Sequence, residues 1–183
     1  MGDFYQKAFV TGGTGFIGRA VVRKLIARGY QVVALARSER GVAMLREMGA
    51  TAAIGDVTDR ESMREAMRGS DIVFHIAGVY DYSPEGLRRC DSVNVGGTRN
   101  VLELAHELNI SRIIHTSTLA VFGDTRGALP DETYFAGGPF LSEYDRTKWL
   151  AHYNVAEGLI AQGAPIIIVM PGAVYGPGDS SWL

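Results

Sequence analysis

The chain has 183 residues, of which 46% are hydrophobic and 21% are charged, a length and composition that suit one soluble globular domain with a sizeable core. Its net charge of −2 gives no reason to expect a nucleic-acid or anionic-membrane partner. No apolar run is long enough to cross a bilayer, the N-terminus has no signal-peptide pattern and the single cysteine, Cys90, excludes an internal disulfide, so we expect a cytoplasmic protein.

Strand and helix signals alternate along the chain. In order, they predict a strand at 6–10, a helix at 15–28, strands at 32–35 and 51–54 separated by a short helix at 41–48, a helix at 59–68 and a strand at 71–75. After a loop at 78–84, they predict a long helix at 85–108, a strand at 111–116, a helix at 143–162 and a strand at 166–170. Gly29 is the expected C-terminal cap of the first helix, and Asp59 is an expected N-cap. Segments 123–141 and 171–183 are rich in proline and glycine and are expected to be irregular, the first as a functional loop.

This alternation predicts an α/β fold with a parallel sheet covered by helices on both faces. Right-handed crossovers favour a doubly wound sheet of the Rossmann type, with strand order 3-2-1-4-5-6. In such a sheet, ligands bind beyond the carboxyl ends of the strands. The polar motifs of this chain fall at those strand ends or in the segments that follow them.

A glycine-rich turn, Thr-Gly-Gly-Thr-Gly-Phe-Ile-Gly at 11–18, joins the first strand to the first helix. Gly12 suits a tight turn, Gly15 allows backbone to approach a pyrophosphate, and Gly18 lets the helix pack close to the sheet. The helix N-terminus offers free N–H groups and a partial positive charge to phosphates. The motif predicts a dinucleotide site; an ordinary glycine-rich turn is the alternative.

Tyr144 and Lys148 stand four residues apart at the start of a predicted helix, so they share one face of it. An ammonium group near a phenol favours the phenolate and lowers its pKa, which suits proton exchange with a substrate hydroxyl. The alternative is a chance helical pair. No grouping of the four histidines with cysteine or carboxylates has the spacing of a metal site, so we expect no metal.

These motifs, together with the segment His-Thr-Ser-Thr-Leu-Ala-Val-Phe-Gly at 115–123, resemble the extended branch of the short-chain dehydrogenases/reductases, the NAD-dependent epimerase/dehydratase family with its dihydroflavonol-reductase-like members. The resemblance runs from Lys7 to Asp179 and implies that Tyr144 is the catalytic acid/base, that Thr118 binds the reacting oxygen and that Lys148 binds the nicotinamide ribose. Phe122 stands where that family usually has a tyrosine.

The resemblance also implies a set of cofactor-binding residues. They are Gly12, Thr14, Gly15, Phe16, Ile17, Gly18, Arg37, Asp56, Val57, Ala77, Gly78, Asn94, Thr116, Tyr144, Lys148, Pro171 and Val174. Asp56 would accept a hydrogen bond from the adenine amino group. Two roles stay open for Asn94, binding a water in a proton relay or holding a backbone bulge.

The end of the second predicted strand favours NADP over NAD, although NAD stays possible. Ala36 occupies the position where NAD-binding chains of this kind carry an acidic residue, and Arg37 follows it directly. A guanidinium can pair with a 2′-phosphate through two hydrogen bonds, and Ser38 can add a third. Glu39 is expected to start the next helix. The alternative is that Arg37 is a solvent-facing charge without a role.

Three functions compete for this sequence. The first is an NAD(P)-dependent oxidoreductase that transfers hydride between nicotinamide and a small carbonyl or alcohol substrate; the second is a nucleotide-sugar epimerase or dehydratase; the third is a non-catalytic dinucleotide-binding sensor. We expect residues 1–183 to be one dinucleotide-binding domain from a longer chain, without the C-terminal substrate domain that the resemblance implies. Apolar residues on the two long helices, among them Leu102, Trp149 and Val155, suggest a homodimer through a four-helix bundle, with packing under the long loop as the alternative.

Overall fold

The computed structural model describes residues 6–179, and within them it has a six-stranded parallel sheet in the order β3-β2-β1-β4-β5-β6. This confirms the predicted doubly wound topology. The strands are β1 (Lys7–Thr11), β2 (Gln31–Ala36), β3 (Thr51–Ile54), β4 (Ile72–His75), β5 (Arg112–Thr116) and β6 (Ile166–Val169). Each lies within about two residues of its predicted bounds. The last four residues of the predicted irregular tail, and the N-terminal segment, lie outside the described residues.

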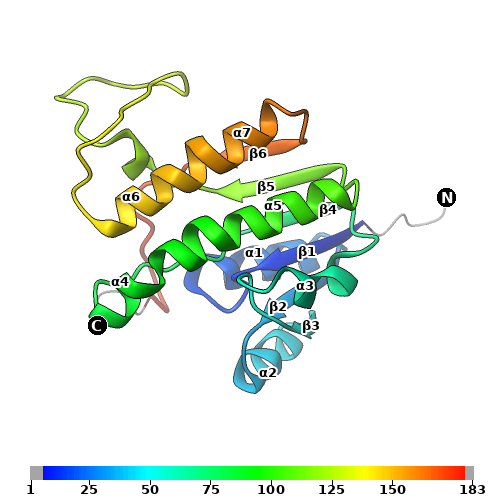
Figure 1. Ribbon diagram of the computed structural model, residues 1–183. Helices are drawn as coiled ribbons and strands as arrows, with labels where there is room; N and C mark the ends of the chain where they lie inside the picture. The colour runs from blue at the N-terminus through cyan, green and yellow to red at the C-terminus, as the bar shows by residue number, and fades with distance from the viewer. Residues whose placement is uncertain (1–5, 180–183) are drawn as a thin grey trace.

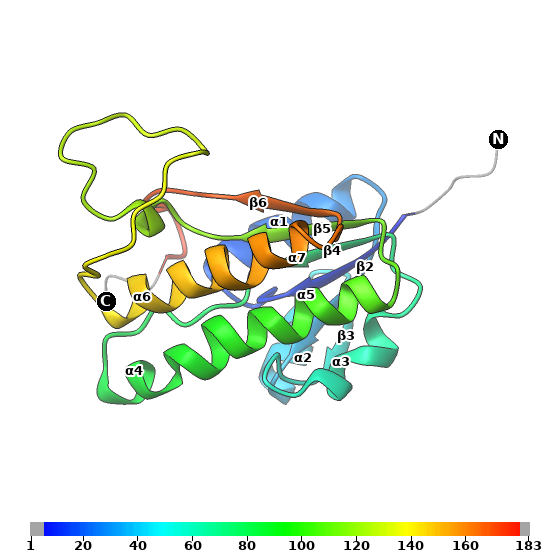
Figure 2. The same ribbon diagram turned by 45° about the horizontal axis from the view of Figure 1, so that its top comes forward.

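Helices cover both faces of the sheet (Figure 1). On one face lie α1 (Phe16–Ala27) and α2 (Glu39–Glu47); on the other lie α3 (Arg60–Met67) and two long helical stretches that run side by side (Figure 2). The first stretch is α4 (Pro84–Cys90), η1 (Asp91–Gly97) and α5 (Thr98–Glu107); the second is α6 (Glu143–Trp149), η3 (Leu150–Glu157) and α7 (Gly158–Ile160). Within residues 6–179, no helix has the length and apolar character that a bilayer-spanning helix requires.

The middle of each long stretch is π-helical, which the sequence did not predict. Both η1 and η3 are wound more widely than the α-helical segments at their ends. The 3.6-residue spacing of apolar side chains continues through these segments and does not distinguish the two kinds of winding. Gly97 at the end of η1 lies against the loop that follows β3, where an added Cβ would stand 2.6 Å from Cγ2 of Val57. The helix therefore packs directly on that loop.

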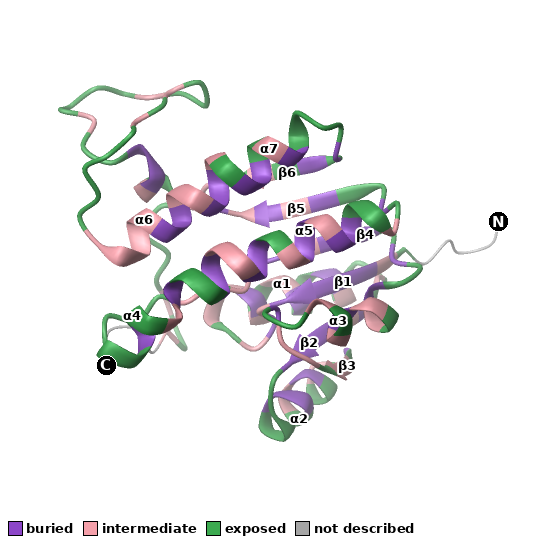
Figure 3. Ribbon diagram, in the orientation of Figure 1, coloured by how far each residue is buried: buried purple, intermediate pink, exposed green. Residues whose placement is uncertain are grey.

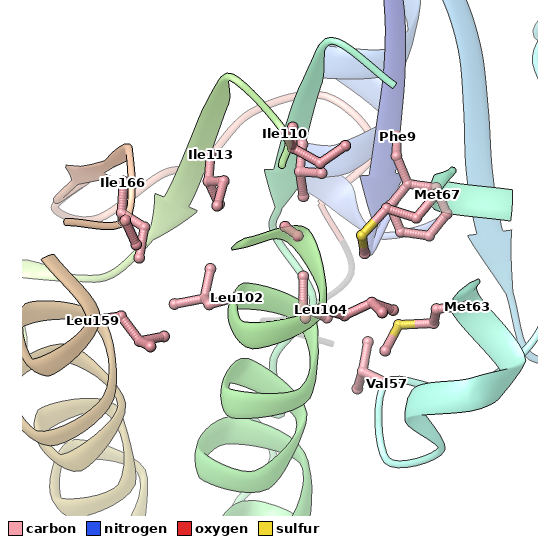
Figure 4. Close-up of a cluster of buried hydrophobic side chains, with 14 of the residues drawn as sticks. Phe9, Val57, Met63, Met67, Leu102, Leu104, Ile110, Ile113, Leu159 and Ile166 are labelled. Carbon is pink, nitrogen blue, oxygen red and sulfur yellow. The ribbon is translucent and has the colours of Figure 1, made fainter. Parts of the chain in front are cut away.

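Buried apolar side chains form a core on each face of the sheet. The ribbon in Figure 3, coloured by burial, shows buried positions along the strands and on the helices. In Figure 4, Ile113 and Ile166 point from the strands toward Leu102 and Leu159 of the two long helical stretches. The core on the other face contains Val10 of β1 with side chains of α1 and α2. The strands are covered on both faces, so side chains can be buried on both sides of a strand. This explains why the strands are continuous apolar runs in the sequence.

Serine and aspartate side chains cap the helices that begin near the carboxyl ends of the strands. Asp59 caps α3 by accepting a hydrogen bond from the Ser62 N–H, as predicted. Oγ of Ser142 accepts a hydrogen bond from the Asp145 N–H at 3.1 Å and so begins α6. Tyr144 therefore lies in the first turn of a well-defined helix, at the edge of the sheet where ligands bind.

The residues proposed for a dimer contact are not on a free surface. Leu102 and Val155 are buried in the core between the helices and the sheet. The Trp149 ring lies between Phe135 and Phe140 of the long irregular segment, with ring centroids 5.7 and 5.6 Å away. Packing under the long loop, the alternative considered for these residues, is therefore what the structure shows for Trp149.

Candidate functional site

A cavity of about 1040 Å³ opens at the carboxyl ends of the strands. Figure 1 shows the arrows of β1 and β5 pointing to this end of the sheet, where α4 and α6 begin. The segments after all six strands line the cavity. Of the predicted site residues, Asn94 alone does not line the cavity. The predicted residues that line it are Gly12, Thr14, Gly15, Phe16, Ile17, Gly18, Arg37, Asp56, Val57, Ala77, Gly78, Thr116, Thr118, Tyr144, Lys148, Pro171 and Val174.

The glycine turn leaves no room for side chains at two positions. Gly12 has a φ of +74°, and a Cβ there would lie 2.6 Å from the backbone nitrogen of Ala77, just beyond β4. A Cβ on Gly18 would overlap the carbonyl oxygen of Gly12. The sequence predicted that Gly18 lets α1 approach the sheet; the structure shows that the close contact is with the turn itself. Both glycines thus hold the start of α1 against the end of β1.

The N-terminus of α1 faces the cavity without a side chain to cap it. Gly15 is the N-cap residue, and its lack of a side chain leaves the N–H groups of the first turn without a side-chain acceptor. No acidic residue lies in that first turn. The turn therefore keeps its partial positive charge and its donors for an anion in the cavity. This cradle fits the pyrophosphate of a dinucleotide.

The end of β2 presents one cation to the cavity. Ala36 is buried, and Arg37 is exposed and lines the cavity. No ion pair within residues 6–179 involves the Arg37 guanidinium. Glu39 is the first residue of α2, as predicted, and Oγ of Ser38 caps that helix by accepting from the Gly41 N–H at 3.2 Å. The backbone thus places Arg37 at the cavity, whereas Ser38 does not line it and its hydroxyl caps α2.

Asp56 lies after β3 with its carboxylate partly engaged. Oδ1 accepts hydrogen bonds from the backbone N–H and the hydroxyl of Thr58, both at 2.9 Å. The neighbouring Val57 is buried and supplies an apolar wall. A carboxylate held beside an apolar wall suits an adenine ring with its amino group at the carboxylate.

Tyr144, Thr118 and Lys148 meet beside the ends of β5 and β6. Burial raises the Tyr144 pKa to about 12, and the neighbouring Thr118 hydroxyl acts on it more weakly in the opposite direction. Nζ of Lys148 donates to the Thr116 carbonyl at 2.8 Å, and burial lowers the Lys148 pKa to about 8. The expectation that Lys148 lowers the Tyr144 pKa is wrong for the protein alone, because the ammonium is directed at the Thr116 carbonyl while the phenol is removed from water.

Asn94 lies outside the cavity and holds backbone. Its Oδ1 accepts from the Val79 N–H at 2.7 Å, and its Nδ2 donates to the Val79 carbonyl at 3.1 Å and to Oγ1 of Thr147 at 3.0 Å. Asn94 is buried within η1, so of its two open roles the geometry favours holding backbone. It joins the loop after β4 to α6, next to Lys148.

Three buried histidines lie beneath Lys148. The rings of His75 and His115 stack with centroids 5.4 Å apart, and Nδ1 of His152 lies 2.7 Å from Oγ of Ser117. Burial, with the nearby Lys148 ammonium, lowers the pKa of His75 to about 3 and that of His152 to about 4, and it holds the His115 pKa well below its ordinary value. Within residues 6–179, neither ring nitrogen of His115 has a hydrogen-bond partner. No group of three or more His, Cys, Asp or Glu in that part of the chain is arranged to hold a metal ion.

The sequence analysis missed several aromatic and apolar residues of the cavity, chiefly Tyr80, Tyr82, Leu119 and Tyr175. Tyr80 and Tyr82 are two residues apart in the loop after β4. Two aromatic residues in a loop that follows a strand end were the sequence feature that could have indicated them. Leu119 and Tyr175 follow β5 and β6 and carried no signal beyond their place after those strands.

Comparisons with known proteins agree with this geometry. A family model described as the NAD dependent epimerase/dehydratase family matches residues 8–181. The chain is 34% identical, over 97% of its length, to 4-hydroxy-2-methyl-3-oxo-4-farnesyl-3,4-dihydroquinoline-1-oxide ketoreductase of Stigmatella aurantiaca, of which it covers 53%. It spans about half the length of the curated relatives that it matches.

Two similar solved structures contain NAD. One is a short-chain dehydrogenase/reductase superfamily protein from Agrobacterium tumefaciens with bound NAD, with 27% identity and a TM-score of 0.76, where the match covers 90% of this chain and 48% of that one. The other is the UDP-glucose 4-epimerase of Thermus thermophilus in complex with NAD, with 26% identity, a TM-score of 0.80, and coverage of 96% and 58%.

The buried histidines predict how stability depends on pH. Each has a folded pKa below its ordinary value of 6.5, so below that pH the unfolded chain binds more protons than the folded chain. We expect the free energy of unfolding to fall as the pH drops from about 6.5 toward 4, by roughly 1.4 kcal/mol per pH unit for each histidine that is charged only when unfolded. Urea unfolding at several pH values measures this slope.

A matched pair of variants isolates the histidine contribution. His115→Leu should reduce the slope by about one proton, whereas His106→Gln, on the exposed side of α5, should leave it unchanged. Equal slopes in the wild type and His115→Leu would show that His115 does not stay neutral in the folded protein.

Proposed function

The chain belongs to the NAD dependent epimerase/dehydratase family, and from this we propose that it forms the dinucleotide-binding part of an NAD(P)-dependent oxidoreductase that transfers hydride between nicotinamide and a carbonyl or alcohol carbon. The observation that carries the proposal is one cavity that is lined both by the glycine turn at the start of α1 and by Tyr144, Thr118 and Lys148. The cofactor supplies or accepts the hydride when it is bound.

We propose the following binding roles. The N-terminus of α1 and the glycine turn hold the pyrophosphate, and Asp56 and Val57 hold the adenine. Lys148 binds the nicotinamide ribose. Its buried ammonium donates to the carbonyl of Thr116, the last residue of β5, and Lys148 lines the cavity. Segment 171–179 closes the cavity over this end and is tied to α1 by a hydrogen bond from the Arg19 guanidinium to the Gly178 carbonyl at 2.9 Å.

The proton step is assigned to Tyr144. In the reductive direction its phenol donates a proton to the carbonyl oxygen, which becomes the hydroxyl of the product, and the phenolate then regains a proton from solvent. Thr118 holds the same oxygen through a hydrogen bond. A pKa of about 12 keeps the phenol protonated near neutral pH, which suits the donor role.

A nucleotide-sugar epimerase is the second candidate, supported by the structural likeness to the Thermus thermophilus UDP-glucose 4-epimerase. The two functions differ in what happens to the cofactor. A reductase consumes added reduced cofactor in proportion to product, whereas an epimerase returns its cofactor to the starting redox state in each cycle. Following absorbance at 340 nm with carbonyl substrates separates them.

We also propose that the protein forms a homodimer in which the α4–α5 and α6–α7 stretches of two copies pack as a four-helix bundle. The two stretches lie side by side on one face (Figure 2), and Val95 and Leu150 are half-buried on them. Light scattering at micromolar concentration should give about twice the 19.8 kDa mass of this chain. A monomeric mass at that concentration would count against the dimer.

Substituting Tyr144 by phenylalanine tests the assigned acid/base. In a full-length, active form of the protein, Tyr144→Phe keeps the ring but removes the proton, so turnover should fall by roughly 10²- to 10⁴-fold while cofactor affinity stays close to that of the wild type. Lys148→Met should reduce both, because the ribose contact is lost too. Steady-state kinetics and cofactor fluorescence titration measure the two effects, and wild-type turnover in Tyr144→Phe would refute the assignment.

Arg37 is proposed to select NADP(H). A 2′-phosphate can form charge-assisted hydrogen bonds with the guanidinium, which favours NADPH over NADH by about 1–3 kcal/mol. Arg37→Ala should therefore weaken NADPH binding and leave NADH binding nearly unchanged. Arg40→Ala, which removes an exposed cation of the same loop and helix start, is the matched control. If Arg37→Ala weakens both cofactors alike, or if the wild type binds both equally, Arg37 does not recognise the 2′-phosphate.

A further inference from the structure

Two tyrosines on the loop between β4 and α4 form an aromatic wall beside Tyr144. Tyr80 and Tyr82 both line the cavity and are each 55% exposed. The Tyr80 ring meets the Tyr144 ring edge to face, with centroids 4.8 Å apart and an interplanar angle of 83°. Tyr82 meets Tyr80 in the same way at 5.4 Å and 81°. Three phenol rings thus form one continuous surface that ends at the proposed proton donor.

The loop that carries this wall is held at both ends. Asn94 binds both backbone groups of Val79, directly before Tyr80. Oδ1 of Asp81 accepts from the Ser83 N–H at 2.8 Å, and a Cβ on Gly86 would lie 2.5 Å from the Asp81 carbonyl oxygen, so α4 packs closely against the loop. The exposed faces of the two tyrosines are therefore positioned before any ligand arrives, which reduces the entropy cost of binding.

The charges around the wall disfavour an anionic ligand. Burial raises the pKa values of Tyr80 and Tyr144, and the half-buried Asp145 carboxylate adds a smaller effect in the same direction on both. Among the described residues that line the cavity, the cations are Arg37, at the end of β2, and Lys148, which is buried against the Thr116 carbonyl. Leu119, 49% exposed, adds apolar surface on the other side of Thr118. A phosphate or carboxylate at the wall would face Asp145 without a cation beside it.

We propose that Tyr80 and Tyr82 form a subsite for the aromatic ring of an uncharged aryl carbonyl compound or the matching aryl alcohol. The inference rests on the proposed oxidoreductase function, since it places the reacting oxygen of such a compound at Tyr144 and Thr118. Aromatic pairs in offset or edge-to-face contact gain affinity beyond the area that they bury. A ring on the exposed faces of Tyr80 and Tyr82 uses that gain, and a saturated ring of similar size does not.

Two ketones with the same carbon skeleton test this subsite. Acetophenone and cyclohexyl methyl ketone differ in whether the six-membered ring is aromatic. With the wild type and saturating cofactor, kcat/KM should favour acetophenone by roughly 2- to 10-fold more than in the double variant Tyr80→Leu, Tyr82→Leu. The variant should raise KM for acetophenone more than KM for the saturated ketone, and any change in kcat that follows from losing the Tyr80–Tyr144 ring contact should be shared by both ketones.

Phe135→Leu is the matched control, because Phe135 is an aromatic side chain, 62% exposed, that does not line the cavity. It should keep the wild-type ratio of the two ketones. If the ratio is the same in the wild type and the double variant while both ketones turn over, the aromatic subsite is refuted and the oxidoreductase function stands.

A binding measurement without turnover tests the aromatic subsite independently of the proposed oxidoreductase function. Saturation-transfer NMR with each ketone, in the presence of NADP⁺, reports contact of the ring with the protein. Suppose that the wild type reduces neither ketone, and that the acetophenone signal is lost in the double variant but kept in the wild type and in Phe135→Leu. This result would support the subsite and contradict the proposed function. Equal signals for the two ketones in all variants would overturn the subsite. Because Tyr80 and Tyr82 are half exposed, unchanged circular dichroism and urea midpoints should confirm that the variants fold.

Discussion

The close approach of backbone to backbone around Gly12 determines where the rest of the site lies. The Gly12 backbone touches that of Ala77 after β4 on one side and that of Gly18 in α1 on the other. No side chain fits between them, so the start of α1 is held against two neighbouring strand ends. The uncapped first turn of α1 consequently faces the cavity with its donors, and the dipole of the helix acts on the same space. The proposed phosphate site depends directly on this packing.

At the opposite end of the cavity, the same sheet has to accommodate a buried cation. The ammonium of Lys148 has little contact with water, and its hydrogen bond to the Thr116 carbonyl offsets part of the cost of burial. The three histidines beneath it stay neutral, since a further positive charge in the same low-dielectric region would be strongly unfavourable. The groups around Lys148 thus stay uncharged, which avoids repulsion between buried cations.

Much of the fold was predictable because it depends on local backbone rules. Alternating strand and helix signals allow few topologies, and Gly12, Gly18 and Asp59 each occupy a position that only a few residue types can fill. The role of Asn94 was not predictable, because its partners Val79 and Thr147 are 15 and 53 residues away in the chain. The Tyr144 pKa depends on burial by segments distant in the sequence, and apolar spacing alone could not say whether Leu102 faces the sheet or a partner.

The two ends of the cavity therefore differ in how they are held in place. The phosphate cradle depends on contacts between backbone atoms, where an added Cβ displaces the turn itself, so few substitutions leave it intact. The wall formed by Tyr80 and Tyr82 is attached through one asparagine and short side-chain hydrogen bonds, and its exposed rings support no part of the core. Under the proposed function, a change of side chain at the wall would alter what the cavity accepts while the glycine turn and Tyr144 stay where they are. Selectivity for the substrate would then change independently of coenzyme binding, since the two are supported by different contacts.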